Sequence, residues 1–314
     1  MPRGTSAMRL LLLLLFTALV TGGEAFAGPR VLVVTSERSG AHEETLGALR
    51  SALSPDISAN DIEIVETRQL DNDMAAEARI IVTIGTQAAK AVGTRSPKQP
   101  VLNTLLPRDA YESLQATLPG QRSSAIFLDQ PVQRQIALLA IALPDRATLA
   151  LLTGPATEEL ARRLAYAARE RQLRVNIEHV ASNAEIYPAL ERLLAEPTML
   201  LALPDSTVFN SYTIQNVLLT SYRNRSPLIG FSPAYVRAGA LLALYSTPAQ
   251  IARQAAEAVR SVLSGGGLPP PQSPREFEVA TNPNVARSLG IELESGERIV
   301  ARMRLRESQR EAKP

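Results

Sequence analysis

The side chains best placed to bind a small molecule follow the ends of short apolar runs between residues 199 and 245. Each run stops in small polar or aromatic residues, and helical sequence separates one run from the next. This pattern is typical of a parallel sheet, whose strands end at a common edge where ligands bind. We therefore expect a binding site formed by Asp205, Ser206, Phe231, Ser232 and Tyr245.

A second group of candidate residues follows apolar runs in the first half of the chain. Thr86 and Gln87 begin a helix directly after the run at 80–84. The free N–H groups at a helix N-terminus suit a carboxylate or another anion, although Thr86 could equally serve only as a helix cap. Ser36 follows the first run, and we expect it either at the edge of the site or in a surface loop.

Asp205 and Thr86 have complementary chemistry and belong to different halves of the chain. The Asp205 carboxylate could hold a ligand ammonium, or it could cap the helix expected at 207–223. If both residues bind, a zwitterion such as an amino acid would place its carboxylate at Thr86 and its ammonium at Asp205. Phe231 or Tyr245 would then pack against the ligand's side chain.

Enzyme signatures are weak by comparison. The sequence GFSPA at 230–234 differs from a G-x-S-x-G nucleophile motif at its last position, and a proline follows Ser232. Both histidines, His42 and His179, precede Ser232, whereas that hydrolase fold places its histidine after the serine. The chain also has no cysteine, no P-loop and no G-x-G-x-x-G segment. We therefore expect no enzyme activity, no metal site and no cofactor.

Residues 1–27 have the features of a secretory signal peptide. Arg3 and Arg9 accompany an apolar segment at 10–20, and the sequence AFA at 25–27 is a small-x-small cleavage site. An uncleaved membrane anchor is the alternative. Because the chain has no cysteine, we do not expect the acylation that anchors lipoproteins. The N-terminus thus predicts an exported, periplasmic protein.

The charge balance and the aromatic content disfavour two kinds of partner. The full chain has 33 basic and 31 acidic residues, a formal net charge of +2. Without residues 1–27 the balance is 31 basic to 30 acidic residues, so we expect no electrostatic attraction to nucleic acid. The chain has no tryptophan and only 4% aromatic residues, which disfavours a stacked platform for sugars.

Strand-like and helix-like segments alternate along the chain in two successive series. Strands are predicted at 31–35, 62–65, 80–84, 101–105, 125–128, 148–152, 175–180, 199–203, 228–231, 240–245 and 277–280. Helices are predicted at 41–53, 86–92, 131–143, 156–171, 184–195, 207–223 and 248–264. Short apolar runs separated by amphipathic helices indicate buried parallel strands. We predict an α/β protein with two doubly wound, Rossmann-like lobes of parallel sheet.

The last part of the chain contains a clear break. Thr247 and Gln250 form a capping box that begins the helix at 248–264, and three glycines at 265–267 end this helix. A proline-rich linker at 268–274 then leads to the last predicted strand. The segment 302–314 is polar, and we expect it to fray, with its arginines on a solvated strand or tail.

Four segments resemble, in the same order, those of a known family. They are IIVTIGTQAA at 80–89, RAGAL at 237–241, IARQAA at 251–256 and NPNVARSLGI at 282–291. The family is that of the ABC transporter substrate-binding proteins typified by the TrpX-like tryptophan/tyrosine-binding proteins, which are type I periplasmic binding proteins. The chain departs from the family pattern at SPD, 54–56, and at LLPRD, 105–109.

The resemblance implies two lobes that close on a ligand about a hinge, as in periplasmic binding proteins of type I. It places lobe one at 29–126 plus 247–272, lobe two at 127–246 plus 273–306, and a polar tail at 307–314. The chain would cross between the lobes near Leu128, Ser246 and Pro274.

In functional terms, the resemblance implies a monomer that captures a small-molecule ligand in the cleft. Its membrane partner would be an ABC transporter permease or another inner-membrane protein. The departures in lobe one leave a second hypothesis open. In it, the chain is a periplasmic sensory or interaction module that keeps the binding-protein fold and acts through a membrane partner.

Overall fold

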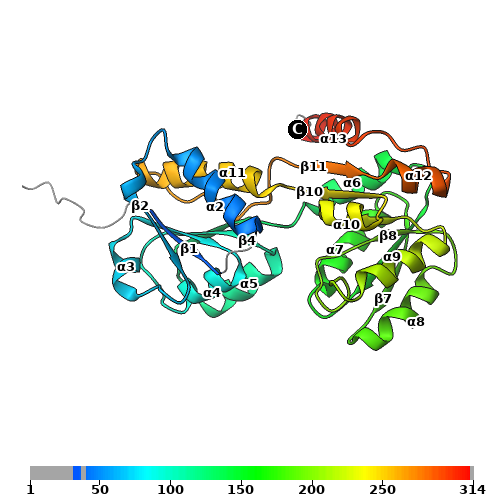
Figure 1. Cartoon of the computed structure of the whole chain (residues 1–314), viewed down its shortest axis with the longest axis horizontal. Coiled ribbons are helices and arrows are strands. Elements are labelled where there is room, and N and C mark those ends of the chain that lie inside the picture. The colour runs from blue at the N-terminus through cyan, green and yellow to red at the C-terminus, as the bar shows by residue number, and fades with distance from the viewer. Residues whose placement is uncertain (1–30, 37–39, 312–314) are drawn as a thin grey trace, which may run out of the picture.

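The computed structural model describes residues 31–36 and 40–311, which form two α/β lobes lying side by side (Figure 1). The predicted signal peptide lies outside the described residues. Each lobe is built on one sheet, and buried apolar clusters lie on both faces of each sheet. The predicted fold class, α/β with two Rossmann-like lobes, is confirmed.

The first lobe contains a five-stranded, fully parallel sheet in the order β2-β1-β3-β4-β5. Every residue of β1 and β3 is buried. This burial explains their continuous apolar sequences, because helices cover both faces of the sheet. The strands are β1 (Val31–Thr35), β2 (Ile62–Glu66), β3 (Ile80–Ile84), β4 (Val101–Leu106) and β5 (Ser123–Phe127). The helices between them are α2 (Gly40–Leu53), α3 (Asn72–Glu77), α4 (Thr86–Gly93) and α5 (Arg108–Thr117).

The second lobe contains a six-stranded sheet in the order β11-β10-β9-β8-β6-β7. All neighbouring pairs are parallel except β10 and β11, which are antiparallel. The strands are β6 (Thr148–Thr153), β7 (Arg174–His179), β8 (Met199–Leu201), β9 (Leu228–Gly230), β10 (Leu242–Tyr245) and β11 (Glu278–Thr281). The helices are α6 (Val132–Ala142), α7 (Glu158–Arg169), α8 (Asn183–Leu193), α9 (Ile214–Arg223), α10 (Pro233–Ala238), α12 (Pro283–Leu289) and α13 (Gly296–Glu311).

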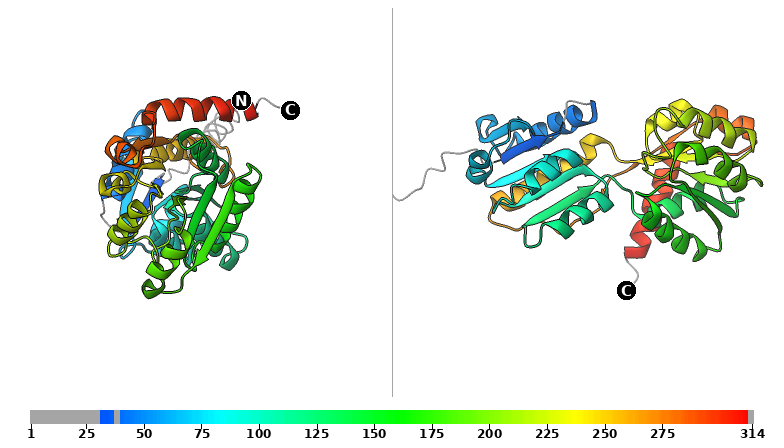
Figure 2. Two further views of the ribbon diagram at one scale, coloured as in Figure 1. Left: turned by 90° about the vertical axis from the view of Figure 1, so that its right-hand side faces the viewer. Right: turned by 90° about the horizontal axis from the view of Figure 1, so that it is seen from below.

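Three crossings of the chain connect the two lobes (Figure 2). The first leads from β5 to α6 and the second from β10 to α11 (Pro248–Leu263). Helix α11 packs on α2 and β4 of the first lobe, and it begins with the predicted capping box between Thr247 and Gln250. The third crossing returns to β11 after Gln272 has formed an isolated parallel bridge with Ile126. The predicted limits of the two lobes remain predictions.

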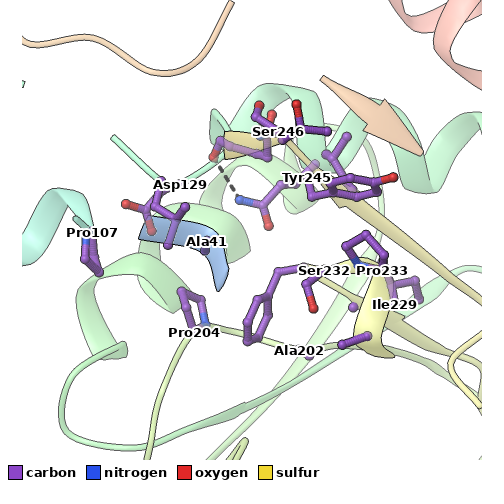
Figure 3. A pocket seen from close by; sticks show the side chains of 18 of the residues that line it. Ala41, Pro107, Asp129, Ala202, Pro204, Ile229, Ser232, Pro233, Tyr245 and Ser246 are labelled. Atoms are coloured by element: carbon purple, nitrogen blue, oxygen red, sulfur yellow. Dashed lines mark hydrogen bonds between the residues drawn. The ribbon is translucent and has the colours of Figure 1, made fainter. Parts of the chain in front are cut away.

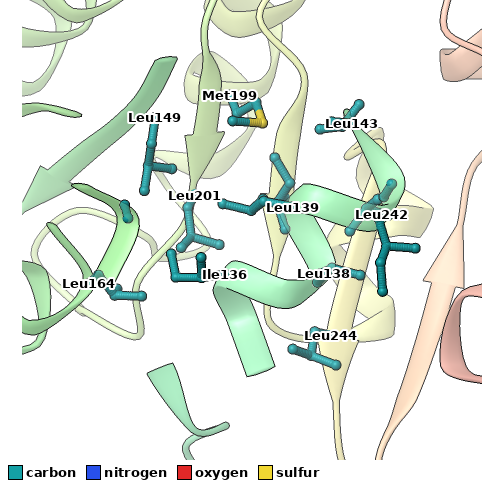
Figure 4. Packing of buried hydrophobic residues seen from close by; sticks show 14 of the residues in the cluster. Ile136, Leu138, Leu139, Leu143, Leu149, Leu164, Met199, Leu201, Leu242 and Leu244 are labelled. Atoms are coloured by element: carbon teal, nitrogen blue, oxygen red, sulfur yellow. The ribbon is translucent and has the colours of Figure 1, made fainter. Parts of the chain in front are cut away.

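The largest apolar cluster joins α6 and α7 to one face of the second sheet (Figure 4). Ile136 and Leu139 of α6 pack against Leu201 and Leu242 in this cluster, and all four side chains are buried. Burial of such side chains stabilises a fold by roughly 1.5–3 kcal/mol each relative to exposure. This packing orients α6, whose first turn lies at the first crossing.

The C-terminal segment corrects one prediction. We expected residues 302–314 to fray, but the described part of this segment belongs to α13, which packs on β11 and α6. Ile299 and Met303 are buried in the core of the second lobe. Of the residues of α13, only these two apolar residues, one helical turn apart, are fully buried, and many arginines surround them in the sequence. The helical periodicity of apolar residues is therefore too weak to indicate this helix.

A second correction concerns the helix predicted at 207–223, which begins later and leaves two tyrosines exposed. Helix α9 begins only at Ile214, so Tyr212 precedes it, and the Tyr212 side chain is 88% exposed. Tyr222 lies on α9 but is 47% exposed. The buried face of α9 is instead formed by Val217, Leu218 and Ser221.

Candidate functional site

A cavity of about 580 Å³ lies between the lobes, where the carboxyl ends of the strands of the second sheet meet the first two crossings. Most of its lining is apolar, as is usual for small-molecule sites. The first lobe contributes Ala41, Glu44 and Pro107. In Figure 3, Ala41, Pro107 and Asp129 lie on one side of the cavity and Ile229, Ser232 and Pro233 on the other. The second lobe contributes, among others, Leu138, Leu160, Leu201, Ile229 and Leu244.

Three of the eight predicted site residues line this cavity: Phe231, Ser232 and Tyr245. Phe231 and Ser232 follow β9, and Ser232 is the N-cap of the short helix α10. Gly230 makes this turn possible, because a Cβ at that position would lie 2.5 Å from the Cβ of Tyr235. The rings of Phe231 and Tyr235 then pack with their centroids 4.6 Å apart.

Tyr245 is the polar aromatic residue of the cavity. Its hydroxyl donates a hydrogen bond to Oε2 of Glu278 on β11 at 2.9 Å. Burial and the neighbouring Glu278 carboxylate raise the pKa of Tyr245 to about 12. The side chain is therefore neutral at physiological pH, and its position is held by Glu278.

Asp205, which we expected in the binding site, does not line the cavity and is buried instead. Its side chain is 1% exposed. The carboxylate accepts hydrogen bonds from the Thr157 hydroxyl and from the backbone N–H of Thr207, both at 2.9 Å. It also fills the space beside Gly154, where an added Cβ would lie 2.6 Å from Oδ1 of Asp205. The neighbouring Ser206 is exposed but does not line the cavity.

Thr86 and Gln87 lie in the first turn of α4 and also do not line the cavity. The N-cap of α4 is Gly85, with φ of 92°. A Cβ at Gly85 would lie 2.5 Å from Nε2 of His42, so this position suits glycine. Ser36 lies at the same place, with its Oγ 3.3 Å from His42 Nε2. Ligand binding by Ser36, Thr86 and Gln87 remains a prediction.

The charged residues of the cavity were not predicted. They are Glu44 in α2 of the first lobe, Asp129 in the first crossing and Arg237 in α10 of the second lobe. Asp129 lies at the end of a strand, as Phe231 and Tyr245 do. The strand-end rule, by which residues at the ends of predicted strands are candidates for the site, could therefore have identified it. Glu44 lies in the helix predicted at 41–53 and belongs to no motif. Arg237 begins the RAGAL segment at 237–241, which indicated the family but no binding role.

Asp129 is held at the start of α5. Its Oδ2 accepts a hydrogen bond from the backbone N–H of Arg108 at 2.5 Å. Burial raises the pKa of Asp129 above its ordinary value, the Arg108 N–H opposes this shift, and the nearby Asp109 carboxylate adds to it. The first crossing is thereby attached to the first lobe through a carboxylate that also faces the cavity.

The segment 105–109, which departs from the family pattern, forms contacts at the lobe boundary. Leu105 has φ of 51°, and the pairing of β4 with β5 shifts between Thr104 and Leu106. After this irregularity Asp109 accepts a hydrogen bond from Nη2 of Arg163 on α7, at 3.2 Å. This ion pair links a helix of the first lobe to a helix of the second.

Among residues 31–36 and 40–311, no group of three or more His, Cys, Asp or Glu side chains is arranged to hold a metal ion. In the same part of the chain, no helix combines the length and apolar character needed to cross a membrane.

Comparison with known proteins places the chain in a family. The family model described as ABC transporter substrate binding protein matches residues 58–303. The chain belongs to this family. It is a family of substrate-binding proteins and not of enzymes. No curated protein matches the sequence.

Solved structures share the fold of this substrate-binding protein. The ligand-free, open structure of a substrate binding protein with adhesive properties from Clostridium difficile is 19% identical, with a TM-score of 0.72 over 85% of this chain and 96% of that one. An ABC domain from Streptococcus pneumonia in complex with L-Trp is 16% identical, with a TM-score of 0.62 over 85% and 96%. A conserved domain protein from Vibrio cholerae is 20% identical, with a TM-score of 0.62 over 87% and 98%. At these identities the likeness establishes the fold alone.

Proposed function

We propose that this protein captures a small solute in the cavity between its lobes and delivers it to the membrane subunits of an ABC importer. One observation carries the proposal: the cavity of about 580 Å³ receives side chains from both lobes and from two crossings. Its volume is within the range of about 300–1,000 Å³ that is usual for small-molecule sites. Because both lobes contribute to the lining, bending at the crossings changes the cavity around its ligand.

The lining supports a ligand with an apolar body and at least one charged group. Phe231, Leu138 and Leu160 offer apolar surface, which suits an aliphatic or aromatic side chain. Arg237 on the second lobe suits a carboxylate, and Glu44 and Asp129 suit an ammonium. We therefore keep the amino-acid-like ligand but reverse its predicted direction, so that its carboxylate meets the second lobe and its ammonium faces Glu44 and Asp129.

The same proposal includes the compartment and the assembly of the protein. Export through the signal peptide at 1–27 would place the mature chain in the periplasm, where the ligand is captured and the importer is reached. The sequence of this N-terminal segment supports the export step. We propose that the protein acts as a monomer, which presents both lobes together to the membrane partner.

The test is thermal unfolding of the mature protein with a panel of amino acids, sugars, nucleosides and short peptides. A ligand present at 100 times its Kd stabilises the folded state by about 2.7 kcal/mol, which raises the melting temperature measurably. We expect hydrophobic amino acids to give the largest shifts. Shifts with sugars or nucleosides alone would contradict the ligand class. The absence of a shift across the panel would favour the sensory or interaction module.

A further inference from the structure

Arg134, on the first turn of α6, is a buried cation at the point where the crossings meet. Its side chain is only 7% exposed. Nη1 donates hydrogen bonds to Oε1 of Gln130 at 2.9 Å and to the carbonyl of Pro274 at 2.8 Å, and Nη2 reaches the carbonyl of Arg275 at 3.4 Å. The guanidinium also lies 4.2 Å from the centroid of the Phe277 ring. One side chain thus binds the first crossing and the third.

Gln130 extends this network to the second crossing. Its Nε2 donates a hydrogen bond to Oγ of Ser246 at 2.8 Å, shown as a dashed line in Figure 3. The Ser246 hydroxyl in turn donates to the carbonyl of Glu276 at 2.5 Å. Gln130 and Ser246 also line the cavity. A single set of hydrogen bonds therefore connects all three crossings and reaches the surface that a ligand would contact.

The countercharge of Arg134 comes from the C-terminal helix. Oε1 of Glu307 on α13 lies 2.7 Å from Nε of Arg134, and Oε2 lies 3.3 Å from Nη2. Glu307 lies beyond residue 303, where the family match ends. Helix α13 runs over β11 and α6 on the outer side of the second lobe (Figure 1). The residue that neutralises the buried cation therefore comes from outside the matched part of the chain.

We propose that Arg134 is the positioning residue of the hinge and that α13, through Glu307, determines how firmly the crossings are held. The guanidinium is planar, and its donors are arranged in a fixed fork, so it binds these carbonyls in one relative arrangement only. A buried guanidinium also requires a counterion. Loss of the Glu307 carboxylate leaves the cation uncompensated, and Arg134 then leaves its place among the crossings.

The experiment measures the distance between the lobes in solution and requires no ligand. Because the chain contains no cysteine, two introduced cysteines would be the only sites for spin labels. Lys90 on α4 and Tyr187 on α8 are exposed and lie on different lobes. Distances in the K90C/Y187C protein would be measured by pulsed electron–electron spin resonance in four backgrounds: unchanged, Glu307→Gln, Arg134→Lys and, as control, Glu297→Gln.

Glu297 is an exposed acidic residue on the same helix, in its first turn, so its replacement controls for a lost charge on α13. We expect a single narrow distance distribution in the unchanged and Glu297→Gln proteins. Glu307→Gln and Arg134→Lys should broaden or shift this distribution, because lysine keeps the charge but lacks the planar fork. If Arg134→Lys does not fold, Glu307→Gln decides the result by itself.

A folded Glu307→Gln protein with the unchanged distribution would overturn the proposal, and so would equal broadening in Glu297→Gln. Since the measurement uses only the labelled protein, it is independent of whether the cavity binds an amino acid. Failure of the ligand panel and failure of the hinge proposal are therefore distinguishable.

Discussion

Replacement of Asp205 distinguishes a structural carboxylate from a ligand-binding one. Asp205→Ala removes the acceptor for two hydrogen bonds, from the Thr157 hydroxyl and the Thr207 N–H, in a side chain that is 1% exposed. A buried donor left without a partner costs about 1–3 kcal/mol. Because Thr207 is only partly buried and water replaces some of its bond, we expect the free energy of unfolding to fall by about 2–4 kcal/mol in total.

The assay is urea unfolding followed by far-ultraviolet circular dichroism with linear extrapolation, since the chain has no tryptophan for fluorescence. Asp205→Asn keeps the shape of the side chain and one acceptor oxygen, so it should lose less stability than Asp205→Ala. Ser206→Ala, at the exposed neighbouring position, should change the stability by no more than about 0.5 kcal/mol. The reasoning is refuted if Asp205→Ala unfolds like the wild type while its affinity for a ligand identified in the panel falls.

Three further predictions concern the cavity and its walls. Burial raises the pKa of Asp129, so the native state binds this proton more tightly than the unfolded state does. The free energy of unfolding should therefore fall as the pH rises from the ordinary pKa of 3.8 through the raised native value. Asp129→Asn should lessen this dependence on pH in urea titrations, and an unchanged dependence would contradict the shift. Arg237→Gln should weaken binding of the panel's best amino acid by about tenfold or more in calorimetry, because this is the loss expected for one charge-assisted hydrogen bond. The control Arg171→Gln changes an exposed residue outside the cavity and should bind normally. Equal affinities of the two variants would remove Arg237 from the site. Gly230→Ala places a Cβ 2.5 Å from that of Tyr235. In urea unfolding, this overpacking should lower the free energy of unfolding by about 1–3 kcal/mol. Wild-type stability would show that the turn relaxes without cost.

The framework of the protein could be predicted because its determinants are local in the sequence. Each of the eleven strands among the described residues overlaps a predicted strand. The signal is clearest for β1 and β3, which are buried along their whole length, because strands covered on both faces are continuously apolar. The capping box at Thr247 was likewise predicted, because its two partners are three residues apart. Helix α13 was missed because Ile299 and Met303 are buried only through contact with β11 and α6.

The site was only partly predictable because the direction of a side chain at a strand end depends on distant segments. The strand-end rule identified Phe231, Ser232 and Tyr245 as candidates, and all three line the cavity. The same rule placed Asp205 in the binding site, but its carboxylate is buried beside Gly154 and bonded to the Thr157 hydroxyl.

What the sequence by itself determined is the strands and their two successive series, through apolar periodicity, and the start of α11, through its capping box. Only the tertiary structure decided which charges face the cavity, because Glu44 and Arg237 come from helices of different lobes. It also decided which carboxylate pairs with the buried Arg134, since Glu307 is 173 residues away in the chain. A buried charge loses its hydration and therefore needs an opposite charge nearby. Which opposite charge lies nearby depends on how the whole chain packs.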